Sequence, residues 1–264
     1  MGEIKHKKLF LLDMDGTLYL GNNLFPETKV FLEGIKKCGG NYIFLTNNTS
    51  KDVGRYVEKL ASMGIDATNQ DIITPTQVVA KFLLEKHRKN KIYAFGTTAF
   101  REELTVAGLS ITDNLEDGIV CLVMGFDTEL TFKKLDDACI LLGCGVDYIA
   151  ANPDLVCPTE YGYVPDCGSV SIMLTNATGR EPKFFGKPNP EMVYWALDRT
   201  GMQKEDAIIV GDRLYTDIAC GINAGIDTAL VLSGETKKED LSNSPYVPTY
   251  IFENVGEMKK QICR

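Results

Sequence analysis

Two aspartates separated by one residue form the start of Asp13-Met14-Asp15-Gly16-Thr17, which directly follows an apolar run. Carboxylates two residues apart along an extended chain point the same way, so their negative charges repel each other. A hard divalent cation with oxygen ligands relieves that repulsion. Gly16 permits a sharp exit from a strand. The spacing therefore predicts a metal-binding pair of carboxylates, Asp13 and Asp15, at the end of a strand.

A third carboxylate follows a different apolar run. Asp212 comes after Ala207–Val210, across Gly211, and Asp217 comes a little more than one helical turn later. Asp212 is expected to join the first two aspartates as a metal ligand, and Asp217 to anchor it without touching the ion. The alternative interpretation of such aspartates is an acidic strand end followed by a turn.

Residues suited to a phosphate group occur at two further points. Thr46 and Asn47 directly follow the apolar run Tyr42–Leu45, and both can donate hydrogen bonds to phosphate oxygens. Lys187, in Gly186-Lys187-Pro188-Asn189-Pro190, can neutralise an aspartate and hold a phosphate oxygen. Taken singly, Thr46 and Asn47 also fit an ordinary turn after a strand, and Lys187 also fits a solvated surface lysine. Their combination with three carboxylates favours a phosphate site.

The elements that must position these residues alternate between short apolar runs and helical patterns, which indicates βαβ units and a parallel sheet. The predicted strands lack polar alternation, as expected for burial on both faces; they are Lys8–Leu12, Tyr42–Leu45, Ala207–Val210 and Ala229–Leu232. Helices are predicted to begin at Ser50, at Pro190 and near Thr216, and to stop at Gly64, Gly201 and Gly225. Because parallel strands end at one edge of their sheet, the polar residues are expected to converge on one crevice.

The middle of the chain is predicted to be a second α/β unit. Its strands are expected at Ile92–Phe95, Ile119–Met124 and Tyr148–Ala150, and its helices near Ala99–Ala107 and Thr131–Leu142. Gly and Pro mark junctions at Thr74-Pro75 and Gly179–Pro182. We therefore expect a first domain made of residues 1–75 and 181–264, with residues 76–180 inserted into it.

The motifs resemble those of the haloacid dehalogenase superfamily of aspartate-nucleophile phosphatases. Four motifs match in order: Asp13–Thr17, Thr46 after a strand, Lys187, and Gly211–Asp217. The NagD-like, 4-nitrophenylphosphatase branch is similar in further features, namely Asn47-Asn48, Gly186–Pro190, the insertion, Gly168-Ser169 and Val231–Gly234. The similarity covers nearly the whole chain.

The resemblance implies a role for each motif residue. Asp13 would attack phosphorus and form an aspartyl-phosphate, and Asp15 would act as the general acid and then the general base. Mg²⁺ would be held by Asp13, the Asp15 carbonyl and Asp212. Thr46, Asn47, Asn48 and Lys187 would bind the phosphate.

The resemblance also implies the architecture. The outer segments would form a Rossmann-like α/β core with a parallel sheet, and the insert would be a C2-type α/β cap that selects the substrate. Two loops of the insert put polar groups after a strand or turn, which makes Asn152, Asp154 and Asp166 candidates for substrate specificity. Surface turns are the alternative interpretation of these loops.

Composition limits the partners. The net charge of -8 over 264 residues repels nucleic acid and anionic lipid, and no apolar stretch approaches the roughly 20 residues of a membrane span. We expect a small phosphorylated metabolite as the partner, with neither nucleic acid nor membrane, and the sequence leaves a homodimer open. The eight cysteines are scattered without metal-site spacing, which fits a reducing cytoplasm.

Two other functions are open at this point. A phosphoaspartate receiver module also places acids, a Thr and a Lys at strand ends, but it is shorter, lacks the inserted domain and has its acidic pair before the phosphorylated aspartate. A phosphotransferase or phosphomutase on the same scaffold would keep Asp13 and pass the phosphoryl group to an acceptor other than water.

Overall fold

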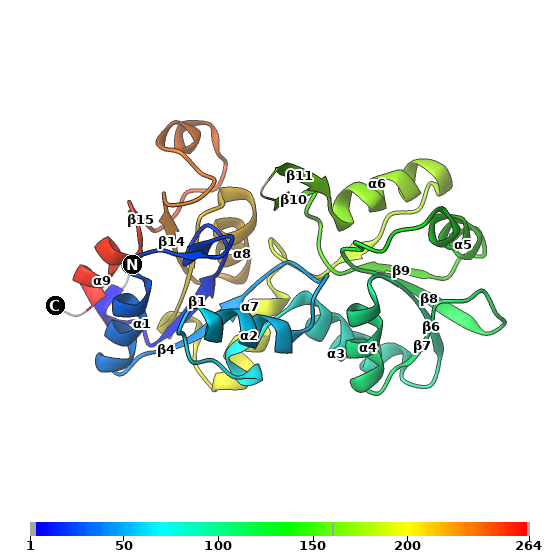
Figure 1. Ribbon diagram of the computed structural model, residues 1–264, viewed down its shortest axis with the longest axis horizontal. Coiled ribbons are helices and arrows are strands. Elements are labelled where there is room, and N and C mark those ends of the chain that lie inside the picture. The colour runs from blue at the N-terminus through cyan, green and yellow to red at the C-terminus, as the bar shows by residue number, and fades with distance from the viewer. Residues whose placement is uncertain (1–3, 160, 263–264) are drawn as a thin grey trace. The chain divides into compact units, whose positions relative to one another are not determined.

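The computed structural model describes residues 4–159 and 161–262. The chain divides into two compact units (Figure 1). The core unit consists of Met1–Thr46, Tyr56–Ile73 and Lys187–Arg264, and the insert unit of Asn47–Arg55 and Thr74–Gly186. Each contains a parallel sheet with helices, so the α/β class is confirmed.

The core unit contains a six-stranded sheet in the order β15-β14-β13-β1-β4-β5, and every neighbouring pair is parallel. All of Leu9–Leu12 is buried, so both faces of the sheet are covered at β1. The four predicted strands are confirmed with ends shifted by one or two residues. The strands are β1 (Leu9–Asp13), β4 (Asn41–Leu45), β5 (Ile72–Ile73), β13 (Ala207–Gly211), β14 (Asp227–Val231) and β15 (Tyr250–Phe252).

Helices and one short hairpin complete the core unit. Gly201 and Gly225 end α7 and α8 with φ of +66° and +74°, the left-handed conformation in which glycine is favoured. The segment predicted as one helix from Thr216 to Ala224 is instead a π-helical turn over Leu214–Ile218 followed by α8. The elements are α1 (Thr28–Lys37), α7 (Glu191–Thr200), α8 (Ala219–Ala224), α9 (Val255–Ile262) and the hairpin β2 (Tyr19–Leu20) and β3 (Asn23–Leu24), and the unit boundary at Tyr56 crosses α2 (Val53–Ser62).

The insert unit contains a five-stranded parallel sheet in the order β12-β9-β8-β6-β7. Thr74, predicted as a junction, caps α3, and Pro75 is the first residue of that helix. The elements are α3 (Pro75–His87), β6 (Lys91–Phe95), α4 (Thr98–Val106), β7 (Ser110–Thr112), β8 (Ile119–Met124), α5 (Phe132–Gly143), β9 (Asp147–Ala150), the antiparallel pair β10 (Val156–Thr159) and β11 (Gly162–Pro165), α6 (Cys167–Thr178) and β12 (Lys183–Phe184).

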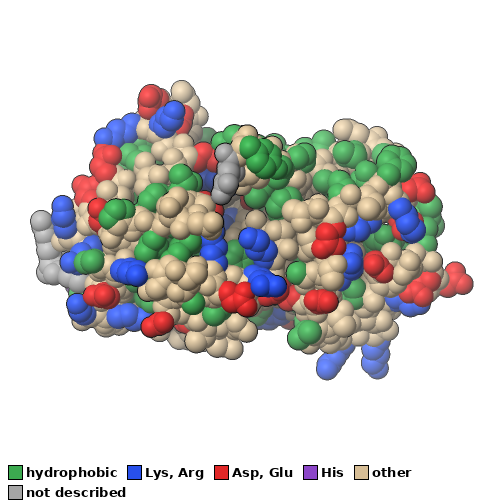
Figure 2. All heavy atoms as spheres, viewed as in Figure 1, with side chains coloured by type: hydrophobic (Ala, Val, Ile, Leu, Met, Phe, Trp, Pro, Cys, Tyr) green, Lys and Arg blue, Asp and Glu red, His purple; other side chains and the backbone are tan. Residues whose placement is uncertain are grey.

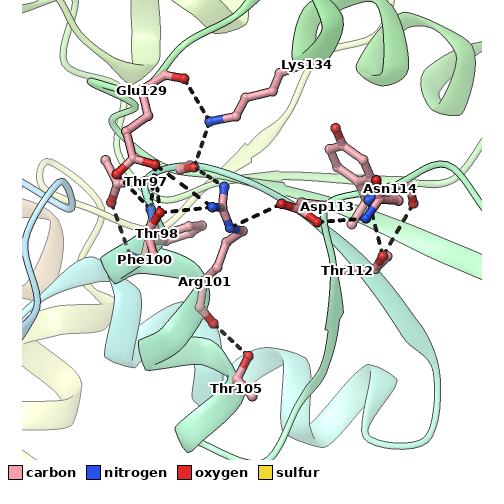
Figure 3. Close-up of polar contacts among 12 residues, drawn as sticks. Thr97, Thr98, Phe100, Arg101, Thr105, Thr112, Asp113, Asn114, Glu129 and Lys134 are labelled. Carbon is pink, nitrogen blue, oxygen red and sulfur yellow. Dashed lines mark hydrogen bonds and ion pairs between the residues drawn. The ribbon is translucent and has the colours of Figure 1, made fainter.

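A polar network joins the loops that follow β6 and β8 in the insert unit. Figure 3 shows Glu129 against Thr98, with Arg101 and Lys134 directed at the same loops. Lys134 Nζ lies 2.7 Å from Asp127 Oδ2 and 3.1 Å from the Gly96 carbonyl oxygen, and Glu129 accepts from the Thr98 N–H at 3.0 Å. The network fixes the carboxyl end of this sheet.

The face of the molecule drawn in Figure 2 carries acidic and basic side chains interspersed with apolar ones. Within residues 4–159 and 161–262, no helix has the length and apolar character needed to cross a membrane.

Candidate active site

The site lies at the carboxyl edge of the core sheet, where β1 and β13 are neighbours. Leu12 pairs with Val210, so Asp13 at the end of β1 and Asp212 just after β13 leave the sheet at the same edge. On the other side of β1, Asp13 pairs with Leu45, the last residue of β4, and Thr46 follows there. The parallel sheet thus brings the predicted motif residues of distant segments to one edge.

Three carboxylates gather around one lysine. Asp13, Asp212 and Asp217 each offer an oxygen, and these oxygens lie within 4.8 Å of one another. Lys187 Nζ is 2.5 Å from Asp13 Oδ1 and 2.6 Å from Asp217 Oδ1. Lys187 and Asp217 have side-chain exposures of only 3% and 1%. The buried group therefore contains more acid than base, and Lys187 is shared between two of the acids.

Hydrogen bonds orient the carboxylates. Thr17 Oγ1 donates to Asp13 Oδ2 at 3.2 Å and lies 3.4 Å from Asp212 Oδ1. The Glu235 N–H donates to Asp212 Oδ2 at 2.7 Å, and the Arg213 N–H donates to Asp217 Oδ2 at 3.1 Å. Sequence reasoning missed Thr17 and Glu235 as contributors. The position of Thr17 inside the Asp13–Thr17 motif could have indicated its role in the site. Glu235 contributes its backbone N–H, which every residue except proline carries, so its residue type gives no indication.

Two glycines are required by this packing. Gly16 has φ of +89°, and a Cβ there would come within 2.4 Å of Asp212 Oδ2. A Cβ on Gly211 would come within 2.3 Å of the Asp217 side chain. Any side chain at either position would displace a carboxylate of the cluster.

Asp15 differs in environment from the other aspartates. Its side chain is exposed, and the acidic cluster found among the described residues does not contain it. The chain turns after β1, and the Thr17 and Leu18 N–H groups both donate to the Met14 carbonyl, at 3.3 and 2.8 Å. Asp15 therefore lies on a turn, where its carboxylate has access to solvent.

The remaining predicted site residues lie in the insert unit. Asn47 Nδ2 donates to Asp154 Oδ1 at 3.0 Å, and Asn152 Nδ2 donates to the Asn47 carbonyl oxygen at 2.8 Å. Asn48 Oδ1 accepts from the Ser50 N–H at 2.9 Å. Asp166 is buried and caps α6, accepting from the Cys167 N–H at 2.5 Å. The structure thus brings Asn47, Asn152 and Asp154 together.

Burial and mutual repulsion perturb the acids. The pKa of Asp13 is raised to about 8. Burial is the largest cause, the negative charges of Asp217 and Asp212 raise the pKa further, and Lys187 lowers it. Burial and Asp217 raise the pKa of Asp212 to about 6. Burial lowers the pKa of Lys187, but Asp13 and Asp217 outweigh it and raise that pKa above its usual value. The cluster therefore holds protons more tightly than isolated carboxyl groups do.

The pH dependence of stability follows from these shifts. We expect the chain in EDTA to become less stable as the pH rises from about 5 to about 8, because raised pKa values give stability at low pH that is lost as the pH passes the folded-state values. Thermal unfolding across this range measures the slope. Glu103, with a pKa of about 7, changes the stability in the same direction. The variant Asp13→Asn separates the contribution of the cluster from that of Glu103, and it should make the dependence of stability on pH less steep. A melting temperature that rises over this range would contradict the assignment.

The donor set fits a hard divalent cation. The cluster offers only carboxylate oxygens, which are the ligands that Mg²⁺ and Ca²⁺ prefer. Burial raises the pKa of Asp13 and Asp212, and the excess negative charge of the cluster raises it further; such a cation would balance that charge.

Two family models match this chain. A haloacid dehalogenase-like hydrolase family model matches residues 10–110, and a HAD-hydrolase-like model matches residues 184–258. The acid sugar phosphatase of Staphylococcus epidermidis is 33% identical over 253 residues, covering 96% of this chain and 97% of that protein.

Solved structures are similar over nearly the whole chain. The 4-nitrophenylphosphatase of Thermotoga maritima is 39% identical, with a TM-score of 0.94 over 99% of this chain and 100% of that one. A glycerol phosphate phosphatase of Mycobacterium tuberculosis, solved in complex with magnesium, is 29% identical, with a TM-score of 0.90 over 98% of this chain and 78% of that one. The chain therefore belongs to the haloacid dehalogenase-like hydrolases, in their NagD-like, 4-nitrophenylphosphatase branch.

Proposed function

We propose that the chain is a Mg²⁺-dependent phosphatase that hydrolyses small phosphate monoesters through an aspartyl-phosphate intermediate. Sugar phosphates, nucleoside monophosphates and 4-nitrophenyl phosphate are the substrates proposed. The observation that carries the proposal is the buried cluster at the edge of the core sheet, in which Lys187 pairs with Asp13 at 2.5 Å beside two further aspartates. The names of the similar acid sugar phosphatase and 4-nitrophenylphosphatase support the same class of reaction.

Asp13 is proposed as the nucleophile. Its carboxylate attacks phosphorus, a bond forms between the carboxylate oxygen and phosphorus, and the bond from phosphorus to the leaving oxygen breaks. Lys187 holds Asp13 in place and offers positive charge to the phosphate oxygens. Thr46, Asn47 and Asn48 are proposed to donate hydrogen bonds to the same oxygens.

Asp15 is proposed as the acid and base. Its exposed carboxyl group protonates the leaving oxygen in the first step and takes a proton from water in the second. Attack by that water on phosphorus releases inorganic phosphate and regenerates Asp13.

The residues proposed to hold Mg²⁺ are Asp13, the Asp15 carbonyl and Asp212. Asp217 is proposed to act as a positioning residue: Lys187 contacts its Oδ1, and the Arg213 N–H donates to its Oδ2. When bound, the ion lowers the repulsion between the anionic nucleophile and the anionic ester. The magnesium and calcium complexes of the similar glycerol phosphate phosphatase support a divalent ion in this fold.

The insert is proposed to act as a C2-type cap and the outer segments as the catalytic domain. The bounds expected from the sequence, 76–180 for the cap and 1–75 with 181–264 for the catalytic domain, differ from the compact units at Asn47–Arg55 and at β12, which pairs within the insert sheet. Asn152, Asp154 and Asp166 are proposed to influence substrate specificity. The contacts of Asn152 and Asp154 with Asn47 support an indirect effect through that residue. A cytoplasmic location is also proposed.

Metal dependence provides the test. With 4-nitrophenyl phosphate and no added acceptor, we expect Mg²⁺ to support release of inorganic phosphate, EDTA to reduce it to a few per cent, and Mg²⁺ but not Ca²⁺ to restore it. Ca²⁺ binds with a larger and looser coordination shell, which would misplace the nucleophile. Full activity in EDTA would remove the metal from the mechanism, and phosphate release only with an added alcohol acceptor would indicate a phosphotransferase.

A further inference from the structure

The loop that follows β14 contacts Asp212 through its main chain. The Glu235 N–H donates to Asp212 Oδ2 at 2.7 Å, and the Thr236 N–H donates to the Asp212 carbonyl oxygen at 3.2 Å. Gly234 packs so closely that a Cβ there would come within 2.0 Å of Oδ2. The orientation of the Asp212 carboxylate therefore depends on the position of this loop.

The Glu235 side chain is held by two residues that follow Asp212 in sequence. Glu235 Oε2 lies 2.9 Å from Arg213 Nε, and Oε1 accepts from the Tyr215 hydroxyl at 2.7 Å. The Glu235 side chain is 38% exposed, so its ion pair is partly screened by solvent and contributes little to stability. Its effect on where the loop lies can therefore be separated from its effect on folding.

The same loop also reaches the segment that carries Asp13. Ser233 Oγ donates to the Gly16 carbonyl oxygen at 2.9 Å. Through Ser233 and Glu235 the loop is hydrogen-bonded to both chain segments that supply the proposed metal ligands.

We propose that Glu235 is a positioning residue for the divalent ion: held by Arg213 and Tyr215, it fixes the backbone N–H that orients Asp212. This inference rests on the proposed function, in which Asp212 is a metal ligand. The loop engages Oδ2 and thereby sets the direction in which Oδ1 faces. Without the Glu235 side chain the loop samples more positions, so ion binding has to order both the loop and the carboxylate.

Isothermal titration of the full chain with Mg²⁺ measures this role directly. We expect Glu235→Ala to raise the Kd by about 10-fold, since removing groups that orient a metal ligand typically weakens binding by roughly 10–100-fold. Glu235→Gln can still accept from Tyr215 and should show a smaller increase, and the melting temperature in EDTA should stay at the wild-type value for both. At saturating Mg²⁺, kcat should return to near the wild-type value.

Two further variants complete the test. Glu253→Ala removes another exposed glutamate, the partner of Lys238, and should bind Mg²⁺ like the wild type. Tyr215→Phe introduced by itself should raise the Kd for Mg²⁺. Added to Glu235→Ala it should raise the Kd little further, because both substitutions remove the same contact. Either of two results would overturn the inference about Glu235 and leave the proposed function standing. One is a wild-type Kd for Glu235→Ala. The other is weakened binding together with a lowered melting temperature that Glu235→Gln does not restore. Absence of Mg²⁺ binding to the wild type would overturn the proposed function as well.

Discussion

Replacing Asp13 with asparagine is expected to lower kcat by at least about 10⁴-fold, because removal of a nucleophile leaves only binding and electrostatic contributions to catalysis. The amide has nearly the shape of the carboxylate, so the fold should be kept. Asn also removes one of the three negative charges whose oxygens lie within 4.8 Å of one another in the cluster. The melting temperature should therefore not fall far, and phosphate release from 4-nitrophenyl phosphate measures the loss.

Two observations make this prediction specific to the nucleophile. Asp66→Asn changes an exposed aspartate of the core unit and should leave kcat unchanged. Acid-quenched wild-type enzyme should carry a phosphoryl group on the peptide that contains Asp13, and the variant should not. If the variant kept more than a few per cent of the activity with an unaltered fold, Asp13 would have another role.

The strands that position the site could be predicted from the sequence because their apolar runs are buried on both faces. The run ending at Asp13 and the run ending before Asp212 each contain only apolar residues, and the structure pairs them as neighbours. The position of each acid relative to its strand then determined at which edge it lies. The helix stops at Gly201 and Gly225 were predictable for a similar reason, since left-handed backbone favours glycine.

Other features depend on contacts between distant segments, which a local pattern does not encode. The insert helix α6 contains Ser, Thr and Asn among its apolar residues and has no charged residue, so its sequence shows no clear amphipathic period. The Glu235 N–H reaches Asp212 across 23 positions, and backbone donors carry no residue-type signal. The pairing of Lys187 with Asp217 likewise follows from the meeting of two segments rather than from either sequence.

After Asp13, the largest effect on activity is expected at Lys187, where stability is expected to fall as well. Lys187→Met keeps the length of the side chain and removes its charge, so Asp13 and Asp217 lose the cation that lies 2.5 and 2.6 Å from them. Removal of one partner from a buried ion pair costs about 3–5 kcal/mol, because the remaining charge stays buried and unpaired. We also expect kcat to fall by about 10³-fold, since loss of a positioned charge at a reacting group typically costs 10²–10³-fold. Urea unfolding and phosphate release measure the two effects, with the exposed Lys260→Met as the control.

The second partner separates the two roles of this lysine. Asp217→Asn placed in the Lys187→Met chain removes one of the unpaired buried acids, so the double variant should recover part of the lost stability. Activity should not recover, because neither substitution returns a positive charge to the phosphate oxygens. Asp217 contacts Lys187 and the Arg213 N–H, and its proposed contribution to catalysis acts only through them. Recovery of kcat in the double variant would mean that Lys187 serves only to neutralise Asp217, whereas a double variant no more stable than Lys187→Met would contradict the buried charge pair itself.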